Sequence, residues 1–411
     1  MASRQENELL TQIGPGTPCG ELMRRYWQPA ALSEELPPGA APVPVRLLGE
    51  DLVLFRDDRS RPGLLGMHCS HRGADLSYGR LEDGGIRCIY HGWLYDVHGK
   101  CLEQPGEPAG STFHERIRHP AYPCQEVGGL IYAYLGPGDP PPLPPFEFVT
   151  VPADYRINTK VFQDCNYLQG NEGNIDPVHL SFLHRMRADG EESAQAYNTE
   201  DTRPIIEVEE TAYGLRIYCV RSVKGGRHYV RVTNYLLPNA SAVSGTSEGY
   251  TVNWHVPIDD THHWRHMIRF SRTQPMDQGG RWMGRSEEVT PDYHMVRSRA
   301  NRYLQDRESM KTGSFCGLGS NFLPHDTCAT EGPGPIQART QEHLGYTDKG
   351  IFAARKVLIR AIHEVEAGSQ APRPTRDDLV ARSDVLLPAS VDWHSYWENA
   401  ALETELTTLR V

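Results

Sequence analysis

Short apolar runs separated by turn signals occupy the first third of the chain and predict β-strands. The clearest runs cover residues 43–48, 52–55 and 130–135, and turn signals such as Asp83-Gly-Gly and His98-Gly alternate with runs of this kind. This pattern predicts a small all-β domain in the N-terminal part of the chain.

The pattern changes after about residue 150. A polar stretch near residues 165–186 predicts a helix, and a β-rich block follows from about residue 204 to residue 272. Farther along, apolar residues with a period of about 3.6 predict one long helix: Ile351, Ala354, Leu358, Ala361, Ile362 and Val365. Together these elements predict a larger α+β domain.

A proline-rich segment separates the two patterns. From Pro137 to Pro145, six of nine residues are proline, and such a segment neither continues a helix nor donates to a β-ladder. It predicts a stiff connector and a division of the chain into residues 1–145 and residues 146–411.

Composition narrows the class of protein. The 411 residues suggest two or three domains, and 38% hydrophobic with 23% charged residues argue against a disordered chain. A net charge of −11 argues against nucleic-acid or anionic-membrane binding. The first residues are polar where a signal peptide is apolar, and the longest apolar stretches are too short to span a bilayer. We therefore expect a soluble, cytoplasmic protein without a membrane or nucleic-acid partner.

Two short motifs in the predicted β domain each combine a cysteine with a histidine. Cys69-Ser-His71 and Cys88-Ile-Tyr-His91 are separated by sixteen residues. Two thiolates on one iron and two imidazoles on the other form a [2Fe–2S] cluster of the Rieske type. The neutral imidazoles lower the negative charge of the cluster and raise its reduction potential, which suits acceptance of electrons from a flavin-linked donor.

A structural zinc site uses the same four ligand types. Zinc loops usually pair like ligands, cysteine with cysteine and histidine with histidine, whereas each loop here is mixed. Gly73 and Gly92 follow the two histidines closely, so the backbone can approach a cluster and donate N–H groups to sulfide. The ligand order therefore favours the iron–sulfur cluster. The chain has nine cysteines, an odd number, and no secretory signal is expected, so metal ligation or buried thiols explain them better than a disulfide framework does.

A second dense group of potential ligands follows the connector. Glu172, Asp176, His179 and His184 lie within thirteen residues, and two histidines with one carboxylate are the usual ligands of a non-haem Fe(II) that activates O₂. The histidines are five residues apart, about 140° around an ideal helix, so a shared metal requires a π-bulge or a loosened turn. Asp176 is within reach of the His179 ring and can equally cap a helix that begins at Pro177.

These motifs resemble those of a known family. Cys-x-His-x₁₆-Cys-x-x-His, with Arg-Gly-Ala after the first histidine and Gly-Trp after the second, resembles the Rieske domain of ring-hydroxylating oxygenases. Glu-x₃-Asp-x₂-His-x₄-His resembles the mononuclear-iron motif of the same family. The segment from Arg339 to Gly345 looks like the Arg-Thr-x-Glu-His-Leu-Gly segment of its phthalate-dioxygenase-like members, many of which have Asp where this chain has Ala338. The resemblance extends from about Leu22 to Ile362.

The resemblance implies a fold and a set of site residues. The fold is an all-β Rieske domain followed by an α+β catalytic domain with an antiparallel sheet flanked by helices, in a helix-grip-like arrangement. The implied cluster ligands are Cys69, His71, Cys88 and His91. The implied iron ligands are His179, His184 and a downstream Asp, for which Asp326 is the candidate and Glu331 the alternative. Asp176 is then the bridge that passes electrons from His91 of a neighbouring subunit to His179, in a head-to-tail homotrimer.

The resemblance also implies an activity. Family members are terminal oxygenase alpha subunits, monooxygenases or dioxygenases of aromatic catabolism, which hydroxylate or O-demethylate aromatic compounds that often carry a carboxylate. We expect a separate NAD(P)H-dependent reductase of flavin or ferredoxin type, because the chain has neither a nucleotide-binding fingerprint nor a plant-type ferredoxin cysteine run. The alternatives are a non-enzymatic Rieske electron-transfer protein, for which the first 145 residues would suffice, and a zinc-stabilised interaction protein.

An aromatic carboxylate bound by an acidic protein requires a local cation, and arginine in a semi-buried pocket is the natural choice. Candidates on the β-rich block are Arg216, Arg221 and Arg231. The alternative is that these arginines lie on the solvent face of a half-exposed sheet. A separate histidine group beside Trp264 is expected in a solvated turn or on a sheet face: His262, His263 and His266.

Overall fold

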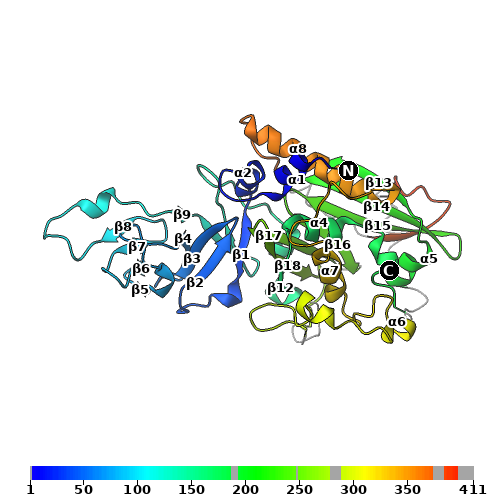
Figure 1. Ribbon diagram of the computed structural model, residues 1–411, viewed down its shortest axis with the longest axis horizontal. Coiled ribbons are helices and arrows are strands. Elements are labelled where there is room, and N and C mark those ends of the chain that lie inside the picture. The colour runs from blue at the N-terminus through cyan, green and yellow to red at the C-terminus, as the bar shows by residue number, and fades with distance from the viewer. Residues whose placement is uncertain (1, 187–192, 247–248, 278–287, 374–383, 397–411) are drawn as a thin grey trace. The chain divides into compact units, whose positions relative to one another are not determined.

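The computed structural model describes residues 2–186, 193–246, 249–277, 288–373 and 384–396 (Figure 1). The chain forms two compact units. The smaller unit comprises Gln12–Leu143 and Val256–Asp260, and the larger unit comprises Met1–Thr11, Pro144–His255 and Thr261–Val411. The chain passes from the smaller to the larger unit within the proline-rich segment, and the first eleven residues group with the larger unit.

The smaller unit is built of short antiparallel strands, as the apolar runs predicted. They are β1 (Gln28–Leu32), β2 (Val43–Leu47), β3 (Glu50–Arg56), β4 (Pro62–Gly66), β5 (Arg80–Glu82), β6 (Gly85–Arg87), β7 (Leu94–Asp96), β8 (Cys101–Glu103), β9 (Ala121–Tyr122), β10 (Cys124–Val127) and β11 (Leu130–Ala133). They form three sheets with the orders β1-β11-β10, β2-β3-β4-β9 and β5-β6-β7-β8. One core of this unit includes Phe55, Ile86 and Tyr95 together with the thiols of Cys69 and Cys88.

The larger unit contains one eight-stranded antiparallel sheet, which confirms the predicted β-rich block. Its strands are β12 (Arg156–Gln163), β13 (Ile205–Thr211), β14 (Gly214–Val223), β15 (Arg227–Leu236), β16 (Ala240–Thr246), β17 (Gly249–Asp259), β18 (His262–Phe270) and β19 (Val385–Pro388). The order is β12-β18-β17-β16-β15-β14-β13, and β19 pairs with β15.

The helices of the described residues are α1 (Arg4–Thr11), α2 (Pro18–Arg24), α3 (Glu147–Thr150), α4 (Tyr167–Ile175), α5 (Ala194–Glu200), α6 (Ser309–Thr312), α7 (Phe322–Glu331) and α8 (Lys349–Glu366). Among these, α2 belongs to the smaller unit and the others belong to the larger unit. Single 3₁₀ turns cover Ser33–Glu35, Leu76–Tyr78, Phe113–Arg116, Ala153–Tyr155, His179–Ser181, Arg299–Leu304 and Tyr346–Asp348.

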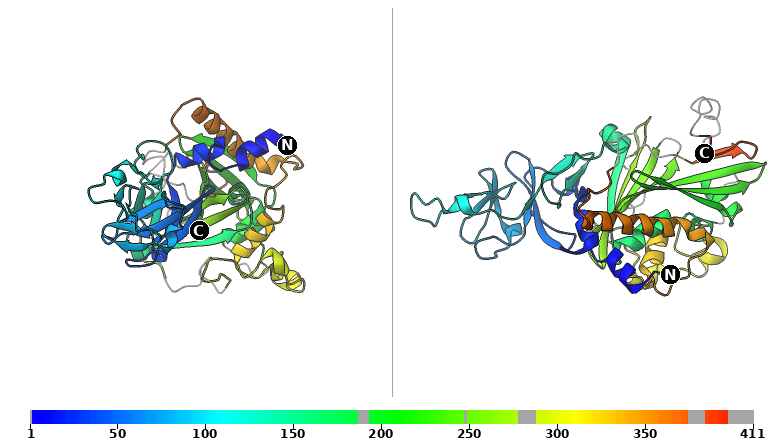
Figure 2. Two further views of the ribbon diagram at one scale, coloured as in Figure 1. Left: turned by 60° about the vertical axis from the view of Figure 1, so that its left-hand side comes forward. Right: turned by 90° about the horizontal axis from the view of Figure 1, so that it is seen from above.

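The predicted long helix is α8. Its apolar stripe packs on β13 and β14, where Ala354 and Val357 join a core with Ile217 and Cys219 of β14. Ile175 at the end of α4 belongs to the same core, and α1 packs alongside α8 (Figure 2). Helices α4 and α8 therefore cover the same face of the sheet.

The helix expected near residues 165–186 is shorter than predicted. α4 ends at Ile175, and Asp176 has extended backbone angles (φ −79°, ψ 113°) because the residue before a proline is sterically excluded from the helical region. One 3₁₀ turn, His179–Ser181, follows. Along this described segment the chain leaves the helix before the first histidine, so neither a π-bulge nor a new helix at Pro177 forms.

The expectation of a solvated histidine group is wrong for two of its three residues. His263 and His266 are fully buried, whereas His262 is half-exposed. β18 lies between β12 and β17, and His263 and His266, whose side chains lie on opposite faces of it, are both buried. His263 contacts His255 and the Cys165 carbonyl, whereas neither ring nitrogen of His266 has a hydrogen-bond partner among the described residues.

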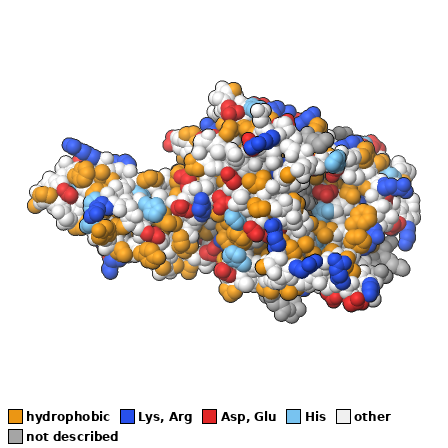
Figure 3. Space-filling model, in the orientation of Figure 1, with side chains coloured by type: hydrophobic (Ala, Val, Ile, Leu, Met, Phe, Trp, Pro, Cys, Tyr) orange, Lys and Arg blue, Asp and Glu red, His pale blue; other side chains and the backbone are white. Residues whose placement is uncertain are grey.

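The surface agrees with the charge pattern of the sequence. On the face drawn in Figure 3, acidic and basic side chains are interspersed, and no continuous basic area is visible there. No helix among the described residues is long and apolar enough to cross a membrane.

Candidate metal centres

The two cysteine–histidine loops of the smaller unit share one backbone frame. In each loop the N–H of the cysteine donates to the carbonyl five residues on, at 2.8 Å in both cases. The glycine four residues on donates back to the cysteine carbonyl, at 2.8 Å from Gly73 to Cys69 and 2.9 Å from Gly92 to Cys88. Both glycines have positive φ, +73° and +75°, which favours glycine over other residues. The two loops are thus equivalent although Cys-x-His and Cys-x-x-His differ by one residue.

The four side chains of these loops are arranged as a Rieske cluster requires. Cys69 and Cys88 are each 3% exposed, and the pKa of Cys88 is raised by burial and by the neighbouring Cys69. The His71 and His91 rings lie nearer the surface with centroids 4.4 Å apart. Two adjacent thiols inside and two imidazoles outside fit one iron each of a [2Fe–2S] cluster.

Neighbouring aromatic side chains support this arrangement. The hydroxyl of Tyr95 lies 3.2 Å from Sγ of Cys69, and Trp93 stacks on the His71 ring with centroids 4.5 Å apart. A hydroxyl hydrogen bond to a cluster sulfur stabilises negative charge on it, and is one of the contacts that set the reduction potential.

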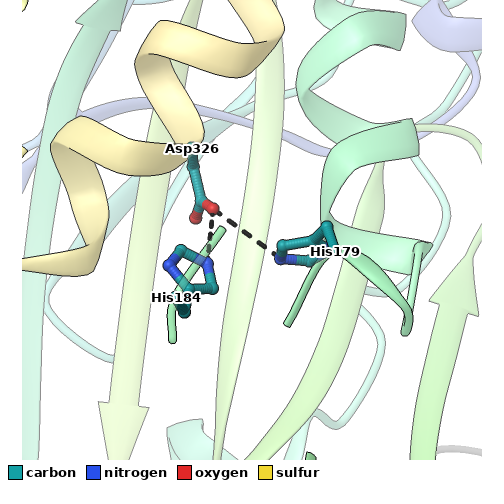
Figure 4. A group of neighbouring side chains, drawn as sticks. All are labelled: His179, His184 and Asp326. Carbon is teal, nitrogen blue, oxygen red and sulfur yellow. Dashed lines mark ion pairs between the residues drawn. The ribbon is translucent and has the colours of Figure 1, made fainter. Parts of the chain in front are cut away.

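In the larger unit, the side chains of His179, His184 and Asp326 face one another (Figure 4). Their ligand atoms all lie within 4.8 Å of one another. Oδ1 of Asp326 is 2.8 Å from Nε2 of His184 and 3.8 Å from Nε2 of His179. Metal–ligand bonds of about 2 Å place two ligands of one ion about 3 Å apart. The geometry and the two-nitrogen, one-oxygen donor set therefore fit one non-haem Fe(II).

Packing between two helices creates this convergence. His179 begins the 3₁₀ turn after α4, His184 lies three residues beyond that turn, and Asp326 is in the middle of α7. α4 and α7 pack against each other. Because the chain leaves the helix at Asp176, the two histidines are released from the angular spacing of a helix and can reach one point.

The far nitrogen of each histidine ring has a partner. Nδ1 of His179 lies 2.6 Å from the backbone carbonyl oxygen of Asp176, so this Nδ1–H donates and leaves Nε2 available to a metal. Burial lowers the pKa of His179, and the carboxylates of Asp176 and Asp326 oppose that shift. Nδ1 of His184 lies 3.2 Å from Nδ1 of His325, and burial lowers the pKa of His325 to about 4.

Asp326 is held as a carboxylate. Nη1 of Arg265 lies 3.2 Å from Oδ2 of Asp326, and Nε of Arg265 donates to Asn253 at 3.0 Å. Burial alone would raise the pKa of Asp326, but His184, Arg265 and His179 together hold it well below its ordinary value. Arg265 thus occupies one carboxylate oxygen, and the other faces the two imidazoles.

Glu331, the alternative third ligand, is directed elsewhere. It lies five residues after Asp326 on α7, about 140° around the helix. Its carboxylate accepts hydrogen bonds from the Tyr303 hydroxyl at 2.6 Å and from the Asp164 N–H at 2.9 Å. Burial raises the pKa of Glu331, and its two oxygens already have partners away from the histidines.

Asp176 lies at the edge of the three-residue centre. It lines a cavity of about 350 Å³ together with His179 and Asp326. Its Oδ1 accepts a hydrogen bond from the N–H of Val178 at 2.8 Å. The contact to the His179 ring expected from the sequence is made by the backbone carbonyl, and no hydrogen bond to Oδ2 forms within the described part of the chain.

Glu172, one turn before Asp176 on α4, anchors this helix by buried ion pairs. It contacts Arg339 at 2.9 Å and Arg355 at 2.6 Å, and Arg355 also contacts Glu342. Burial would raise the pKa of Glu172, but the two guanidinium groups hold it below its ordinary value. The Arg-Thr-x-Glu-His-Leu-Gly segment thereby fixes the helix that leads into the iron motif.

The three candidate arginines lie on two different faces of the sheet. Arg231 is directly opposite Cys219, on the face that α4 and α8 cover, and the alternation along β14 places Arg221 there too. Arg216 lies on the opposite face beside Tyr218. Arg216 pairs with Glu209 at 3.2 Å and Arg231 with Asp384 at 3.3 Å.

Arg221 differs from the other two arginines. It is fully buried, which excludes a solvent-facing position for it, and no ion pair to it forms among the described residues. Its guanidinium donates to the carbonyl of Pro177 at 2.8 Å and to Oγ of Ser181 at 3.3 Å. These partners belong to the segment that connects Asp176 to His184. Burial lowers the pKa of Arg221.

Two contacts of the candidate iron ligands are not predicted by the sequence. Arg265 is part of the His-His-Trp-Arg-His group, which the sequence placed in a solvated region, and only its buried strand brings it to Asp326. His325 directly precedes Asp326, so a histidine beside a candidate ligand was the available signal.

Two protein families match this chain, one in its N-terminal part and one in the remainder. The Rieske [2Fe-2S] domain family matches residues 26–122, and the LigXa C-terminal domain like family matches residues 133–409. The phthalate 4,5-dioxygenase oxygenase subunit of Pseudomonas putida is 34% identical over 96% of this chain and 95% of its own length. The 5,5'-dehydrodivanillate O-demethylase oxygenase subunit of Sphingobium sp. is 33% identical over 93% of this chain and 86% of its own length. A solved oxygenase–ferredoxin complex of carbazole 1,9a-dioxygenase has a similar fold, with a TM-score of 0.57 at 21% identity over 90% of this chain and 96% of that chain.

The chain belongs to the Rieske oxygenases, and its smaller unit is a Rieske [2Fe-2S] domain. Within that class it is a terminal oxygenase alpha subunit of the phthalate-dioxygenase-like branch, with a LigXa-type C-terminal domain. The interpretation as an oxygenase is therefore favoured over a stand-alone electron carrier, because the similarity covers both parts of the chain.

Proposed function

We propose that this oxygenase hydroxylates or O-demethylates an aromatic carboxylate at an iron held by His179, His184 and Asp326. The main support is the convergence of two imidazole nitrogens and one carboxylate oxygen within 4.8 Å, in a chain that also has a Rieske domain. When bound, an Fe(II) with open positions supplies O₂ activation, and the cluster supplies electrons one at a time. The surrounding residues orient the ligands and keep them in the protonation state that a metal needs.

Contacts on the far side of the ligands perform that task. The carbonyl oxygen of Asp176 accepts a hydrogen bond from Nδ1–H of His179, and Arg265 donates a hydrogen bond to Oδ2 of Asp326. Both contacts direct the remaining donor atoms toward a common point. Orienting partners of this kind are worth about 10- to 100-fold in metal affinity or activity.

The electrons come from NAD(P)H through a separate reductase of flavin or ferredoxin type. Support comes from the solved neighbour of similar fold, which is an oxygenase in complex with ferredoxin. The cluster ligands are Cys69, His71, Cys88 and His91, and the half-exposed His91 ring is the exit for the electron.

The electron then enters the iron site of a neighbouring subunit through Asp176, in a head-to-tail homotrimer. Asp176 is partly exposed, lines the cavity that reaches His179 and Asp326, and has one carboxylate oxygen without a hydrogen bond from the described residues. That oxygen is suited to accept a hydrogen bond from His91 of the next subunit.

The substrate class is an aromatic carboxylate, and Arg221 is its cation. The relatives act, by their names, on phthalate and dehydrodivanillate, both of which carry carboxylates. Arg216 and Arg231 each have a carboxylate partner already. Arg221 is buried and has no carboxylate partner within the described ranges. It donates to the carbonyls of Asp201 and Pro177, and its hydrogen bonds to Ser181 Oγ and Cys219 Sγ are weak contacts that a carboxylate can replace.

The test is a substrate screen on purified protein with an NADH-linked reductase. Benzoate, phthalate and methoxybenzoate analogues are compared with their uncharged amides for coupled consumption of O₂ and NADH. We expect coupled turnover with the carboxylates, and product analysis separates ring hydroxylation from methyl-ether cleavage. Turnover of uncharged aromatics alone would exclude the anion-binding role of Arg221. If iron quantification and EPR of the purified protein showed a single iron environment, the proposal of a cluster and a separate mononuclear iron would be contradicted.

A further inference from the structure

The two histidines proposed to bind iron are held by chemically different partners. Nδ1 of His179 donates to a backbone carbonyl at 2.6 Å. Nδ1 of His184 faces another imidazole nitrogen, Nδ1 of His325, at 3.2 Å. A carbonyl can only accept, whereas an imidazole nitrogen can donate or accept, so the second contact leaves the position of one proton to be determined.

The other side of the His325 ring determines that proton. Nε2 of His325 lies 3.1 Å from the carbonyl oxygen of Gly319, which requires a proton on Nε2. A neutral imidazole has one N–H, so Nδ1 of His325 is the acceptor and Nδ1 of His184 is the donor. The carbonyl of Leu183 also faces the His325 ring. If the single ring proton of His325 were donated to that carbonyl, the hydrogen bond to the Gly319 carbonyl would be lost.

We propose that His325 is a positioning residue for the iron site, which fixes the tautomer and orientation of His184 by accepting its Nδ1 proton. With Nδ1 holding its proton, Nε2 of His184 is the nitrogen that a metal can take, and it faces Oδ1 of Asp326, 2.8 Å away. With the opposite tautomer of His325, Nδ1 of His184 would have to accept and its Nε2 would carry the proton, which blocks metal binding. This inference rests on the proposed iron site.

The packing around His325 suits this role. His325 is fully buried and His184 is 2% exposed, so water does not substitute for the hydrogen bond. Phe322, one turn before His325 on α7, stacks on the His184 ring with centroids 4.5 Å apart. α7 therefore supplies the proposed carboxylate ligand Asp326 and, from the preceding residue, the partner that orients a ligand on another segment.

Two substitutions of His325 and one control separate hydrogen bonding from packing. His325→Leu fills the space without an acceptor. In His325→Gln the amide oxygen can accept from His184 while the amide NH₂ donates to the Gly319 carbonyl. The control Phe322→Leu removes a ring that contacts His184 by stacking alone. Circular dichroism and thermal unfolding of each full-length variant report the folding of the larger unit, and the absorbance and EPR signals of the Rieske cluster report the folding of the smaller one.

The measurement is the affinity of the mononuclear site for Co(II), after chelation has emptied that site and left the cluster in place. We expect His325→Leu to weaken Co(II) binding about 10- to 100-fold, as loss of an orienting partner does, and His325→Gln to restore most of it. Phe322→Leu should change it much less. Equal losses in His325→Leu and His325→Gln, or unchanged binding in His325→Leu, would overturn the inference. Failure of the wild-type chain to bind Co(II) would instead overturn the proposed iron site.

A second measurement needs no variant. In ¹⁵N-histidine NMR of the wild-type chain with Zn(II) in the mononuclear site, Nδ1 of His184 should be protonated and Nδ1 of His325 unprotonated. The reverse assignment for His325 would refute the proposal even if every substitution impaired folding.

Discussion

The cluster loops and the proposed mononuclear centre place their candidate ligands by opposite means. Each cluster loop is a local structure, closed by backbone hydrogen bonds between residues four and five apart and by one glycine with positive φ. The mononuclear centre has no such local frame, because His179 and His184 follow a broken helix and Asp326 comes from α7, far along the chain. The first site is defined by its own loops, and the second depends on how α4 packs against α7.

The two centres also differ in the electrostatic environment of their candidate ligands. The cluster thiols lie in an apolar core, where burial raises the pKa of Cys88 and opposes the thiolate. The Asp326 side chain is 18% exposed, and His184, Arg265 and His179 hold its pKa low against the effect of burial. The mononuclear centre is therefore preorganised for a cation by Arg265 and the imidazoles, whereas the cluster loops need their irons to stabilise the thiolates. The two centres should respond independently to substitutions.

The largest expected effect is the loss of one centre alone. His184→Ala should lower the iron content by about one atom per chain and abolish turnover, because two remaining ligands do not hold a non-haem iron tightly. The Rieske absorbance and EPR spectrum should persist, since the loops are in the other unit. Iron quantification with EPR measures both, and unchanged iron content would remove His184 from the ligand set.

Asp176→Asn should keep both metals and still lower turnover by orders of magnitude. The substitution removes the negative charge between two imidazoles that makes Asp176 a good hydrogen-bond acceptor, while the backbone carbonyl that holds His179 remains. The measurement is single-turnover oxidation of the reduced cluster in the presence of substrate and O₂. Asp348→Asn, in the wall of the same cavity, is the matched control, and an equal effect there would mean that only the charge of the cavity matters.

The contrast between the two sites also explains what could be predicted from the sequence. The cluster loops are complete within short motifs, so ligand order alone identified Cys69, His71, Cys88 and His91 as a group. Strands β2, β3 and β11 and the stripe of α8 followed from periodicity. These features depend on local spacing, which a sequence states directly.

Features that depend on packing could not be predicted in this way. The end of α4 at Asp176 follows from Pro177, yet the polar pattern continues past this proline and predicts a longer helix. The burial of His263 and His266 depends on what covers the two faces of β18, which the sequence does not state. Arg265 and His325 reach the proposed iron ligands only through that packing. The choice of Asp326 over Glu331 depends on the direction of two side chains on one helix.

A smaller effect is expected from Arg221, and it concerns specificity. Arg221→Gln should lower kcat/KM for an aromatic carboxylate about 10- to 100-fold, because a hydrogen bond to a charged group contributes about 1.5–3 kcal/mol. The uncharged amide should be affected much less, so the ratio of the two kcat/KM values falls. Arg216→Gln, on the opposite face of the sheet, should leave that ratio unchanged. A parallel loss for both substrates in Arg221→Gln would make Arg221 a clamp of the Pro177–Ser181 segment instead.

The smallest expected effect concerns the potential of the cluster. Tyr95 is fully buried and its hydroxyl lies 3.2 Å from Sγ of Cys69. A hydrogen bond donated to a cluster sulfur stabilises the additional negative charge of the reduced state, so Tyr95→Phe should lower the reduction potential. A redox titration followed by EPR measures the shift, and the iron content and turnover should change little because no ligand is lost. The Tyr95 contact lies in the core of the smaller unit and not at α7, so Tyr95→Phe should bind Co(II) at the mononuclear site as tightly as the wild type does. A changed Co(II) affinity in Tyr95→Phe would show that the two centres are coupled through the protein.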